Sequence, residues 1–313
     1  MADHAKGNRY ALVTGATSGF GIEFSKLLAK DGYNLVLVAR DEQRLLEVTD
    51  DLTQAFMIEA VPIPKDLFSP TAAEEIYAET QAKGINVEVL INDAGQGQHG
   101  NFVEYDIARD VDMIQLNITS LVALTKFYLK DMLLRDNGKI LQIASILGEY
   151  PTPNMAVYAA TKAFVISFSA ALQQELKETK VTITALLPGA SDTDFFHKAG
   201  AEQTVTYREQ SLSKPEDVAK DGYHALMKGE NKITSGMKNK AYTAMTSVLP
   251  DSAKAASMEK QMQPSEKEDG RERSTHGPSL EERERIESKT GRTNGDYNEH
   301  EDHVHKENEN EGL

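Results

Sequence analysis

The amino-acid sequence predicts an α/β fold with a doubly wound parallel sheet of about seven strands and helices on both faces. Three observations predict this fold. Short apolar runs alternate along the chain with segments that have helical spacing. Several of these runs are apolar without interruption, which is typical of strands buried on both faces of a sheet. A glycine-rich turn joins the first run to the first helical segment, as in folds that bind nucleotides.

The glycine-rich turn lies between a strand expected over residues 10–13 and a helix that continues from Ile22. At such a junction, free backbone N–H groups and the positive end of the helix dipole point to one place, which suits a phosphate. Gly15 can adopt a turn conformation that other residues avoid, whereas Gly19 and Gly21 permit close approach of a ligand. A turn with no ligand is the alternative. The residues expected to contact a dinucleotide here are Gly15, Thr17, Ser18, Gly19, Phe20 and Gly21.

The residue after the second apolar run indicates which dinucleotide is bound. The run over residues 34–39 is followed by Arg40. In an NAD-binding fold this place has an acid that holds the ribose 2′-hydroxyl. The guanidinium of Arg40 can instead hold the 2′-phosphate of NADP. The alternative is that Arg40 is a solvated loop charge and Asp41 a helix N-cap. We expect NADP(H) as the preferred coenzyme and NAD(H) as the second choice.

Five further runs are expected to form strands and to bring polar residues to one edge of the sheet. They cover residues 60–64, 87–91, 139–144, 181–187 and 232–234. Because the carboxyl ends of parallel strands meet at the edge where such folds bind ligands, Asp66, Asn92 and Ser145 are expected there. A helix cap, a turn and an ordinary strand end are the alternatives for these three residues.

The chemistry is expected on two helices. A helix expected over residues 155–177 has Tyr158 and Lys162 four residues apart on one face. A lysine cation near a phenol favours the phenolate, so it brings a poor acid–base group toward a useful pKa. The alternative is a tyrosine packed over a lysine stem. Asn117 lies in a mostly apolar helical stretch over residues 109–134, where its amide needs hydrogen-bond partners. A structural role, in which the amide bonds neighbouring backbone, is the alternative for Asn117.

Composition limits the class of protein. The chain has 313 residues, a formal charge of −15 and no cysteine, which argues against a nucleic-acid surface and excludes disulfides. The polar N-terminus and the absence of any stretch judged long enough to span a membrane predict a cytoplasmic protein with no membrane partner. We expect one catalytic domain over residues 1–263 and an acidic, disordered tail over 264–313. The tail histidines, His300, His303 and His305, have no fixed geometry in such a tail, so no metal site is expected.

Taken together, these residues resemble the short-chain dehydrogenases/reductases over roughly residues 8–234. The order and spacing of several motifs carry the resemblance. They are Thr14-Gly15-x-x-x-Gly19-x-Gly21, Asp66, Asn92-x-Ala94-Gly95, Asn117, Ser145, Tyr158-x-x-x-Lys162 and Pro188-Gly189-x-x-x-Thr193. The resemblance implies a Rossmann-type fold.

The resemblance implies four catalytic residues. Tyr158 would be the acid–base residue, and Lys162 would lower its pKa and bond the nicotinamide ribose. Ser145 would hydrogen-bond the substrate oxygen, where negative charge develops. Asn117 would hold a water in a proton relay from Lys162.

The resemblance also implies coenzyme contacts and an assembly. Asp66 would contact the adenine, Asn92 would brace the sheet, and Thr193 would hold the carboxamide. Ala94, Gly95, Pro188 and Gly189 complete the expected coenzyme site. Helices that carry Asn117 and Tyr158 commonly pack on a second subunit in this family, so a homodimer or homotetramer is expected. The chain departs from the family pattern at Asp93, which stands where an asparagine is usual, and at Ser18, where some NADP-preferring members have a basic residue.

The function predicted is hydride transfer between NADP(H) and the carbonyl or secondary alcohol of a small, mainly apolar substrate. The loop over residues 146–154 and the segment over 190–204 would line the substrate pocket, with the second acting as a lid. Their apolar members are Leu147, Tyr150, Met155, Phe195 and Phe196. The alternative is a catalytically idle NADP-binding sensor or scaffold that acts through its tail. A sugar-nucleotide epimerase or dehydratase is a third interpretation, weakened because no larger C-terminal substrate domain follows.

Overall fold

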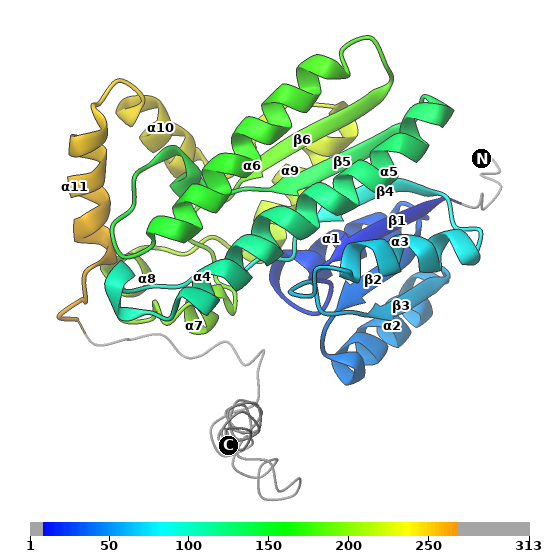
Figure 1. Cartoon of the computed structure of the whole chain (residues 1–313), viewed down its shortest axis with the longest axis horizontal. Helices are drawn as coiled ribbons and strands as arrows, with labels where there is room; N and C mark the ends of the chain where they lie inside the picture. Colours follow the sequence, from blue (N-terminus) through cyan, green and yellow to red (C-terminus); the bar gives the residue numbers. More distant parts are fainter. Residues whose placement is uncertain (1–8, 268–313) are drawn as a thin grey trace, which may run out of the picture. The chain divides into compact units, whose positions relative to one another are not determined.

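The computed structural model describes residues 9–267. These residues form one seven-stranded sheet in the order β3-β2-β1-β4-β5-β6-β7, and each neighbouring pair is parallel. The strands are β1 (Tyr10–Thr14), β2 (Asn34–Ala39), β3 (Ala60–Pro64), β4 (Val87–Asn92), β5 (Gly138–Ile143), β6 (Val181–Leu187) and β7 (Lys232–Thr234). The predicted doubly wound parallel sheet is confirmed (Figure 1). The predicted tail lies outside the described residues from position 268 onward.

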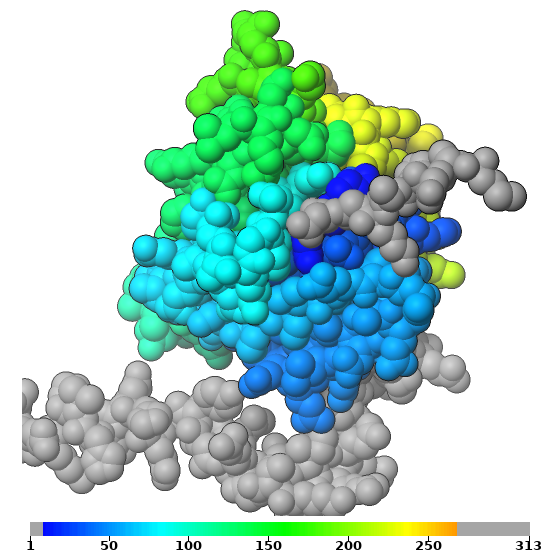
Figure 2. Space-filling view, turned by 90° about the vertical axis from the view of Figure 1, so that its right-hand side faces the viewer, coloured from blue at the N-terminus to red at the C-terminus, as the bar shows by residue number. Residues whose placement is uncertain are grey.

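The helices lie between and around these strands. They are α1 (Gly19–Lys30), α2 (Glu42–Phe56), α3 (Ala72–Ala82), α4 (Ile107–Ile114), α5 (Leu121–Arg135), α6 (Ala156–Glu175), α7 (Phe195–Lys198), α8 (Val205–Glu209), α9 (Pro215–Lys228), α10 (Met237–Thr246) and α11 (Asp251–Met262), with short turns η1 (Phe102–Glu104), η2 (Gln115–Ser120) and η3 (Ile146–Glu149). On the face seen in Figure 2, the blue-to-cyan N-terminal part lies mostly below the green-to-yellow part that follows it.

The strands are uninterrupted apolar runs because both faces of the sheet are covered. In β1, Leu12 and Val13 point to opposite faces, and both are fully buried. Val13 belongs to a core with Phe24 of α1 and Leu226 of α9. Leu12 belongs to a second core on the other face, with Tyr128 of α5 and residues of α3.

The sheet creates a ligand crevice where the strand order reverses. Strand β1 pairs with β2 on one side and with β4 on the other, so successive connections leave β1 in opposite directions. The loops after β1 and β4 therefore diverge at the carboxyl edge and leave a crevice between them. The glycine-rich turn and the segment after Asn92 lie at this crevice.

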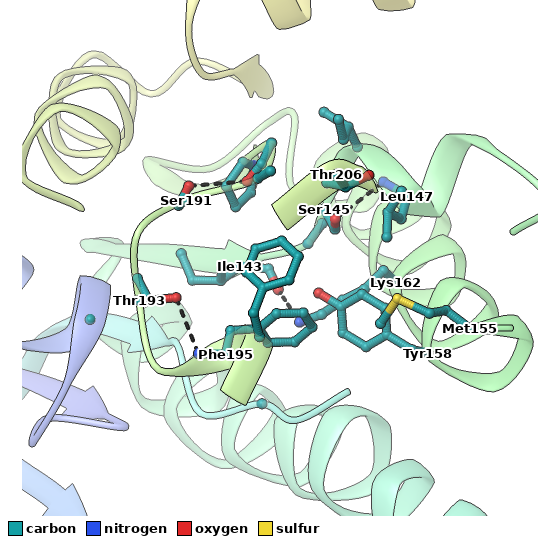
Figure 3. A pocket seen from close by; sticks show the side chains of 18 of the residues that line it. Ile143, Ser145, Leu147, Met155, Tyr158, Lys162, Ser191, Thr193, Phe195 and Thr206 are labelled. Carbon is teal, nitrogen blue, oxygen red and sulfur yellow. Dashed lines mark hydrogen bonds between the residues drawn. The ribbon is translucent and has the colours of Figure 1, made fainter. Parts of the chain in front are cut away.

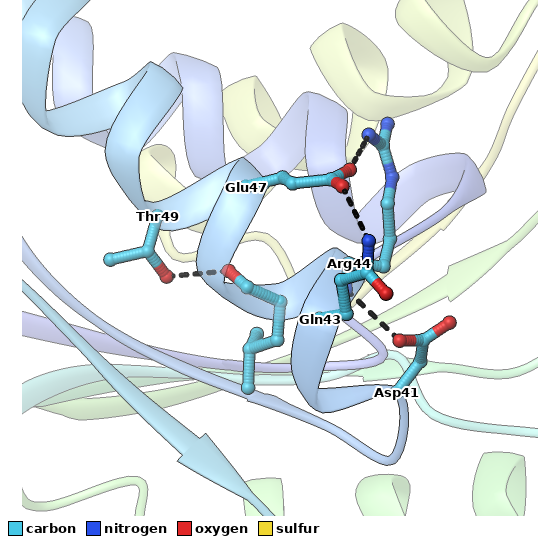
Figure 4. A network of polar contacts seen from close by, with 6 residues as sticks. Asp41, Gln43, Arg44, Glu47 and Thr49 are labelled. Carbon is cyan, nitrogen blue, oxygen red and sulfur yellow. Dashed lines mark hydrogen bonds and ion pairs between the residues drawn. The ribbon is translucent and has the colours of Figure 1, made fainter.

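The start of α2 shows how local chemistry fixes the loop after β2 (Figure 4). The Asp41 carboxylate accepts a hydrogen bond from the backbone N–H of Arg44 at 2.9 Å, so Asp41 is the expected N-cap. The Arg44 guanidinium pairs with Glu47 at 2.9 Å. Arg40, the residue before the cap, remains more than half exposed beside the crevice.

Helix α6 corrects one expectation. Among the described residues it alone has the length and apolar composition that a membrane span needs, so the expectation that no stretch approaches such a span is wrong. Its inner face includes the buried side chains of Tyr158, Lys162 and Ser169, and it contacts β6 and η3. Helix α6 is thus one of the helices that cover the sheet.

The C-terminal part of the described chain also departs from expectation. The sequence predicts a helix over residues 241–249, whereas α10 begins at Met237 and a further helix, α11, follows it. Helix α11 has Met258 and Met262 as its buried residues, and apart from three alanines its other residues are polar. So weak an apolar pattern does not predict a packed helix.

Candidate active site

The glycine-rich turn has the conformation that phosphate binding requires. Gly15 has a φ of 71°, which favours glycine. A methyl group at Gly21 would collide with the Gly15 carbonyl, so close approach of the turn to α1 requires glycine there. The Ser18 side chain makes no capping bond at the N-terminus of α1. Because the first N–H groups of a helix lack intrahelical partners, this end of α1 suits an anion.

Side chains at the ends of β1 and β4 fix the position of the two strand ends that border the crevice. The Thr14 hydroxyl accepts hydrogen bonds from the backbone N–H groups of Asp93 and Ala94, both at 3.0 Å. The Asn92 amide donates to Thr125 Oγ1 at 3.0 Å and to Gln142 Oε1 at 2.9 Å. These bonds fasten the end of β4 to β1, β5 and α5 beside the expected coenzyme.

Three of the four residues expected to be catalytic surround one cavity. Tyr158 and Lys162 come from α6, and Ser145 follows β5 (Figure 3). The Lys162 Nζ atom lies 5.8 Å from the centre of the Tyr158 ring and donates to the Ile143 carbonyl at 2.8 Å. The Ser145 hydroxyl accepts a bond from the backbone N–H of Leu147 at 3.1 Å, which fixes it at the start of η3.

Asn117, the fourth of these residues, does not line the cavity. Its Oδ1 accepts from the backbone N–H of Gln96 at 3.0 Å, and its Nδ2 donates to the Gln96 carbonyl at 2.9 Å and to Thr161 Oγ1 at 3.1 Å. A methyl group on Gly95 would be 3.3 Å from both Asn117 Oδ1 and Lys162 Nζ, so the two side chains are neighbours. Asn117 occurs in η2, a π-helical turn, and such turns are frequent at functional sites.

Burial dominates the electrostatics of the two titratable residues. Dehydration of the phenolate raises the pKa of Tyr158, and the Ser145 hydroxyl offsets part of that rise. Burial lowers the pKa of Lys162 to about 8, and Asp93 offsets part of that change. The net direction for Tyr158 is opposite to the expected one, because the cost of burying the phenolate outweighs the hydrogen bond from Ser145.

Two expected coenzyme residues lie at the rim of the crevice beyond the cavity. The Arg40 Nε atom lies 4.0 Å from Asp66 Oδ1, and the Arg40 guanidinium stacks over the Phe68 ring, 5.0 Å from its centre. Asp66 also accepts a bond from the backbone N–H of Phe68 at 3.1 Å. Arg40 therefore lies at the carboxyl ends of β2 and β3 with Asp66 and Phe68 as neighbours, and its side chain is more than half exposed.

The cavity has a volume of about 410 Å³ and brings together residues from distant parts of the chain. The expected coenzyme and catalytic residues that line it are Ser18, Gly19, Phe20, Gly95, Ser145, Tyr158, Lys162, Pro188, Gly189 and Thr193. The others lie outside its lining, namely Gly15, Thr17, Gly21, Arg40, Asp66, Asn92, Ala94 and Asn117. Thr193 lies against the glycine-rich turn, since a methyl group on Gly19 would be 3.3 Å from its Cγ2.

The substrate side of the cavity is only partly as expected. Leu147, Met155, Phe195 and Phe196 line it, but Tyr150 does not, because its hydroxyl bonds Thr246 at 2.6 Å. The Phe195 ring lies 5.0 Å from the Tyr158 ring, so α7 crosses directly in front of the phenol.

Residues of α10 and α11 complete the lining, and no sequence motif indicates them. They are Lys238, Asn239, Tyr242, Met258, Gln261 and Met262. The end of α11 reaches the cavity because His99 Nε2 bonds the Met262 carbonyl at 2.8 Å. The one available signal is the four-residue spacing of Met258 and Met262 in a polar segment.

The family model described as short chain dehydrogenase matches residues 9–204. The chain belongs to the short-chain dehydrogenase family. The expected assignment to this family of oxidoreductases is therefore confirmed.

Individual relatives agree with that assignment. A very-long-chain 3-oxoacyl-CoA reductase of Bos taurus is 35% identical over 187 residues, which are 57% of this chain and 58% of the relative. The chain thus spans less than two thirds of that relative's length. A "probable NADP-dependent dehydrogenase" of Haemophilus influenzae is 33% identical over 67% of this chain and 84% of the relative. Among solved structures, a short-chain dehydrogenase from Sphingobium yanoikuyae in complex with NADPH matches with a TM-score of 0.68 and 26% identity, over 77% of this chain and 96% of that one.

Proposed function

We propose that the protein is an NADP(H)-dependent oxidoreductase that interconverts a carbonyl group and a secondary alcohol on a small, mainly apolar substrate. The observation that carries the proposal is the meeting of Ser145, Tyr158 and Lys162 in a cavity that continues to the glycine-rich turn. A phenol, a hydroxyl and an ammonium group in one cavity suit proton transfer to a carbonyl oxygen.

The residues present fit a dinucleotide. The glycine-rich turn leaves no room for a side chain at Gly21 and directs the N-terminus of α1 to the crevice, where a pyrophosphate would lie. Thr193 and Lys162 line the same cavity and would hold the nicotinamide and its ribose. When bound, the coenzyme supplies the hydride.

The chain's own residues would handle the proton. Because burial keeps Tyr158 protonated, its hydroxyl is ready to donate a proton to the carbonyl oxygen during reduction. The Ser145 hydroxyl would hydrogen-bond the same oxygen. Lys162, which is an ammonium group below its pKa of about 8, would favour the phenolate that remains, and the Ile143 carbonyl orients that ammonium group. Asn117 positions the segment around Gln96 that closes this end of the site.

The lining of the cavity supports an apolar substrate. Tyr158 belongs to a cluster with Met113, Met155 and Met262, and Leu147 and Phe195 pack on it. Flexible methionine side chains and an aromatic ring adapt to apolar groups of varied shape. A medium-sized ketone is the substrate that this lining favours, in keeping with the prediction from the sequence.

Helix α6 supports the proposed homo-oligomer. Ala156, Ala160, Ala163 and Phe164 lie on its outer, exposed face. Small residues permit close helix approach, so a second copy of α6 would fit there. A homodimer or homotetramer in the cytoplasm is part of this proposal.

Coenzyme titration tests the proposal. NADPH and NADH are titrated into the full chain, and the bound coenzyme is followed by its fluorescence. We expect preference for NADPH, and loss of that preference in Arg40→Asp, because a carboxylate repels the 2′-phosphate. Arg44→Asp is the matched control, since Arg44 pairs with Glu47 rather than with the crevice. Binding of neither coenzyme would contradict the proposed function, and equal preference in wild type and Arg40→Asp would contradict the role of Arg40.

A further inference from the structure

Asp93 places an ionisable carboxyl group inside the proposed coenzyme site. It follows Asn92 at the end of β4 and lines the cavity. Its Oδ2 would be 3.2 Å from a methyl group on Gly15 and 3.0 Å from one on Gly21, so it is wedged against both glycines of the turn. An asparagine at this position, the usual residue in the resemblance described above, carries no charge.

The surroundings of Asp93 supply both a donor and an acceptor. The backbone N–H of Gly21 hydrogen-bonds the carboxyl group. The Gly15 carbonyl lies against the same point of Gly21 as Asp93 Oδ2 does. A carboxylate can only accept hydrogen bonds, whereas a protonated carboxyl group can also donate one to a backbone carbonyl of the turn, as an amide does.

Two cations near Asp93 favour its ionised form, but they do not outweigh the effect of burial. Lys162 faces it from α6 and Lys198 faces it from α7, but Lys198 also pairs with Asp194 at 3.8 Å. Burial outweighs both cations and raises the pKa of Asp93 to about 7. The group therefore changes charge near neutral pH.

We propose that Asp93 takes up one proton from solvent when the coenzyme binds, and that the neutral carboxyl group then donates a hydrogen bond to the glycine-rich turn. The reason is electrostatic. Asp93 lies against the turn where the pyrophosphate would bind, and an anion there is repelled by a carboxylate but not by a carboxylic acid. Binding also displaces water from the crevice, which disfavours the carboxylate further. Asp93 is thus a positioning residue that makes coenzyme affinity depend on pH, an inference that rests on the proposed function.

Calorimetric titration tests this inference. NADPH is titrated into the full-length protein at several pH values, in buffers with different enthalpies of ionisation, which reports protons taken up on binding. Above about pH 7 the affinity of the wild type should fall by up to about tenfold per pH unit. Asp93→Asn should bind NADPH with a flatter pH profile and take up fewer protons. Protonation of the NADPH 2′-phosphate is common to both proteins and cancels in the comparison.

Two further measurements make the result specific. Asp192→Asn removes the same charge from an exposed position, so it should keep the wild-type profile. Difference infrared spectra of wild type with and without NADPH should gain the band of a protonated carboxyl group, and the band should be absent in Asp93→Asn. Equal proton uptake in wild type and Asp93→Asn, with no such band, would overturn the inference while leaving coenzyme binding intact. Absence of NADPH binding to wild type would instead contradict the proposed function and the inference with it.

Discussion

The two sides of the cavity differ in what holds their parts together. On the coenzyme side, the turn after β1 and the segment after β4 are joined by Thr14, whose hydroxyl bonds Asp93 and Ala94. On the substrate side, His99 bonds Met262, which is 163 residues away, and Tyr150 bonds Thr246, which is 96 residues away.

This difference has a physical origin. The coenzyme side consists of strand ends, and parallel pairing brings strand ends to one edge whatever the loops contain. The substrate side consists of short helices that lie beyond the sheet, and only side-chain contacts decide where they pack. Residues 203–209, around α8, are held to residues 261–267 by the bonds from Val205 to Gln263 and from Ser265 to Gln203. A coenzyme site can therefore follow from motifs, whereas the substrate site depends on the packing of the C-terminal helices.

The largest loss of activity is expected for a change of Tyr158, where the coenzyme side and the substrate side of the cavity meet. Tyr158→Phe removes the proposed proton donor but keeps the ring that packs on Phe195. Turnover of a ketone substrate should fall about 10²- to 10⁴-fold, while the Kd for NADPH stays at its wild-type value. Steady-state NADPH oxidation and a fluorescence titration measure the two quantities. Wild-type turnover in this variant would refute the acid–base role of Tyr158, and an unchanged biological activity despite lost turnover would favour the sensor or scaffold.

A change on the coenzyme side should leave the substrate side unaffected. In Gly21→Ala, the added methyl group meets the Gly15 carbonyl and the Asp93 carboxyl group. Overpacking of this kind costs about 1–3 kcal/mol. The free protein relieves this strain by moving the turn out of its coenzyme-binding conformation, so the Kd for NADPH should rise about 10- to 100-fold. Saturating coenzyme should restore the wild-type KM for substrate. The thermal midpoint of the free protein serves as the control for folding, and an unchanged Kd would show that this turn does not bind the coenzyme.

A change on the substrate side should show the opposite pattern. Met262 is buried against Tyr158, Met113 and Met155 at the end of α11. Met262→Ala should cost about 2 kcal/mol of stability and raise the KM for an apolar ketone several-fold, with the Kd for NADPH unchanged. Met245→Ala is the matched control, because Met245 is 76% exposed. If Met262→Ala and Met245→Ala behave alike, α11 does not shape the substrate site.

The smallest expected effect concerns the free protein and its pH dependence. The pKa of Asp93 rises from 3.8 to about 7 on folding, so the folded state binds more protons than the unfolded state between these values. Stability contributed by this group is therefore lost as pH rises from about 4 to about 7. Asp93→Asn should be more stable than wild type, and its advantage should grow by about 1–2 kcal/mol between about pH 5.5 and about pH 8. Urea unfolding at the two pH values measures this, and a constant difference would mean that Asp93 is ionised in both states.

The sequence by itself determined the sheet and the coenzyme edge. Uninterrupted apolar runs such as residues 34–39 are possible only where both faces are covered, and their alternation with helical segments leaves few topologies. The four-residue spacing of Tyr158 and Lys162 fixes them on one helix face, and Ser145 follows from its place at a strand end. Each of these inferences needs only local periodicity and the rule that parallel strands end together.

Only the tertiary structure decided the electrostatics and the substrate side. The sequence predicts that Lys162 lowers the pKa of Tyr158, but the depth of burial, which spacing does not specify, raises it. Helix α11 enters the site because Met262 packs with Tyr158 of α6 and Met113 of α4, both of which lie more than 100 residues earlier in the chain. The lining of the substrate cavity is therefore a property of packing between distant segments, whereas the coenzyme edge is a property of the strands themselves.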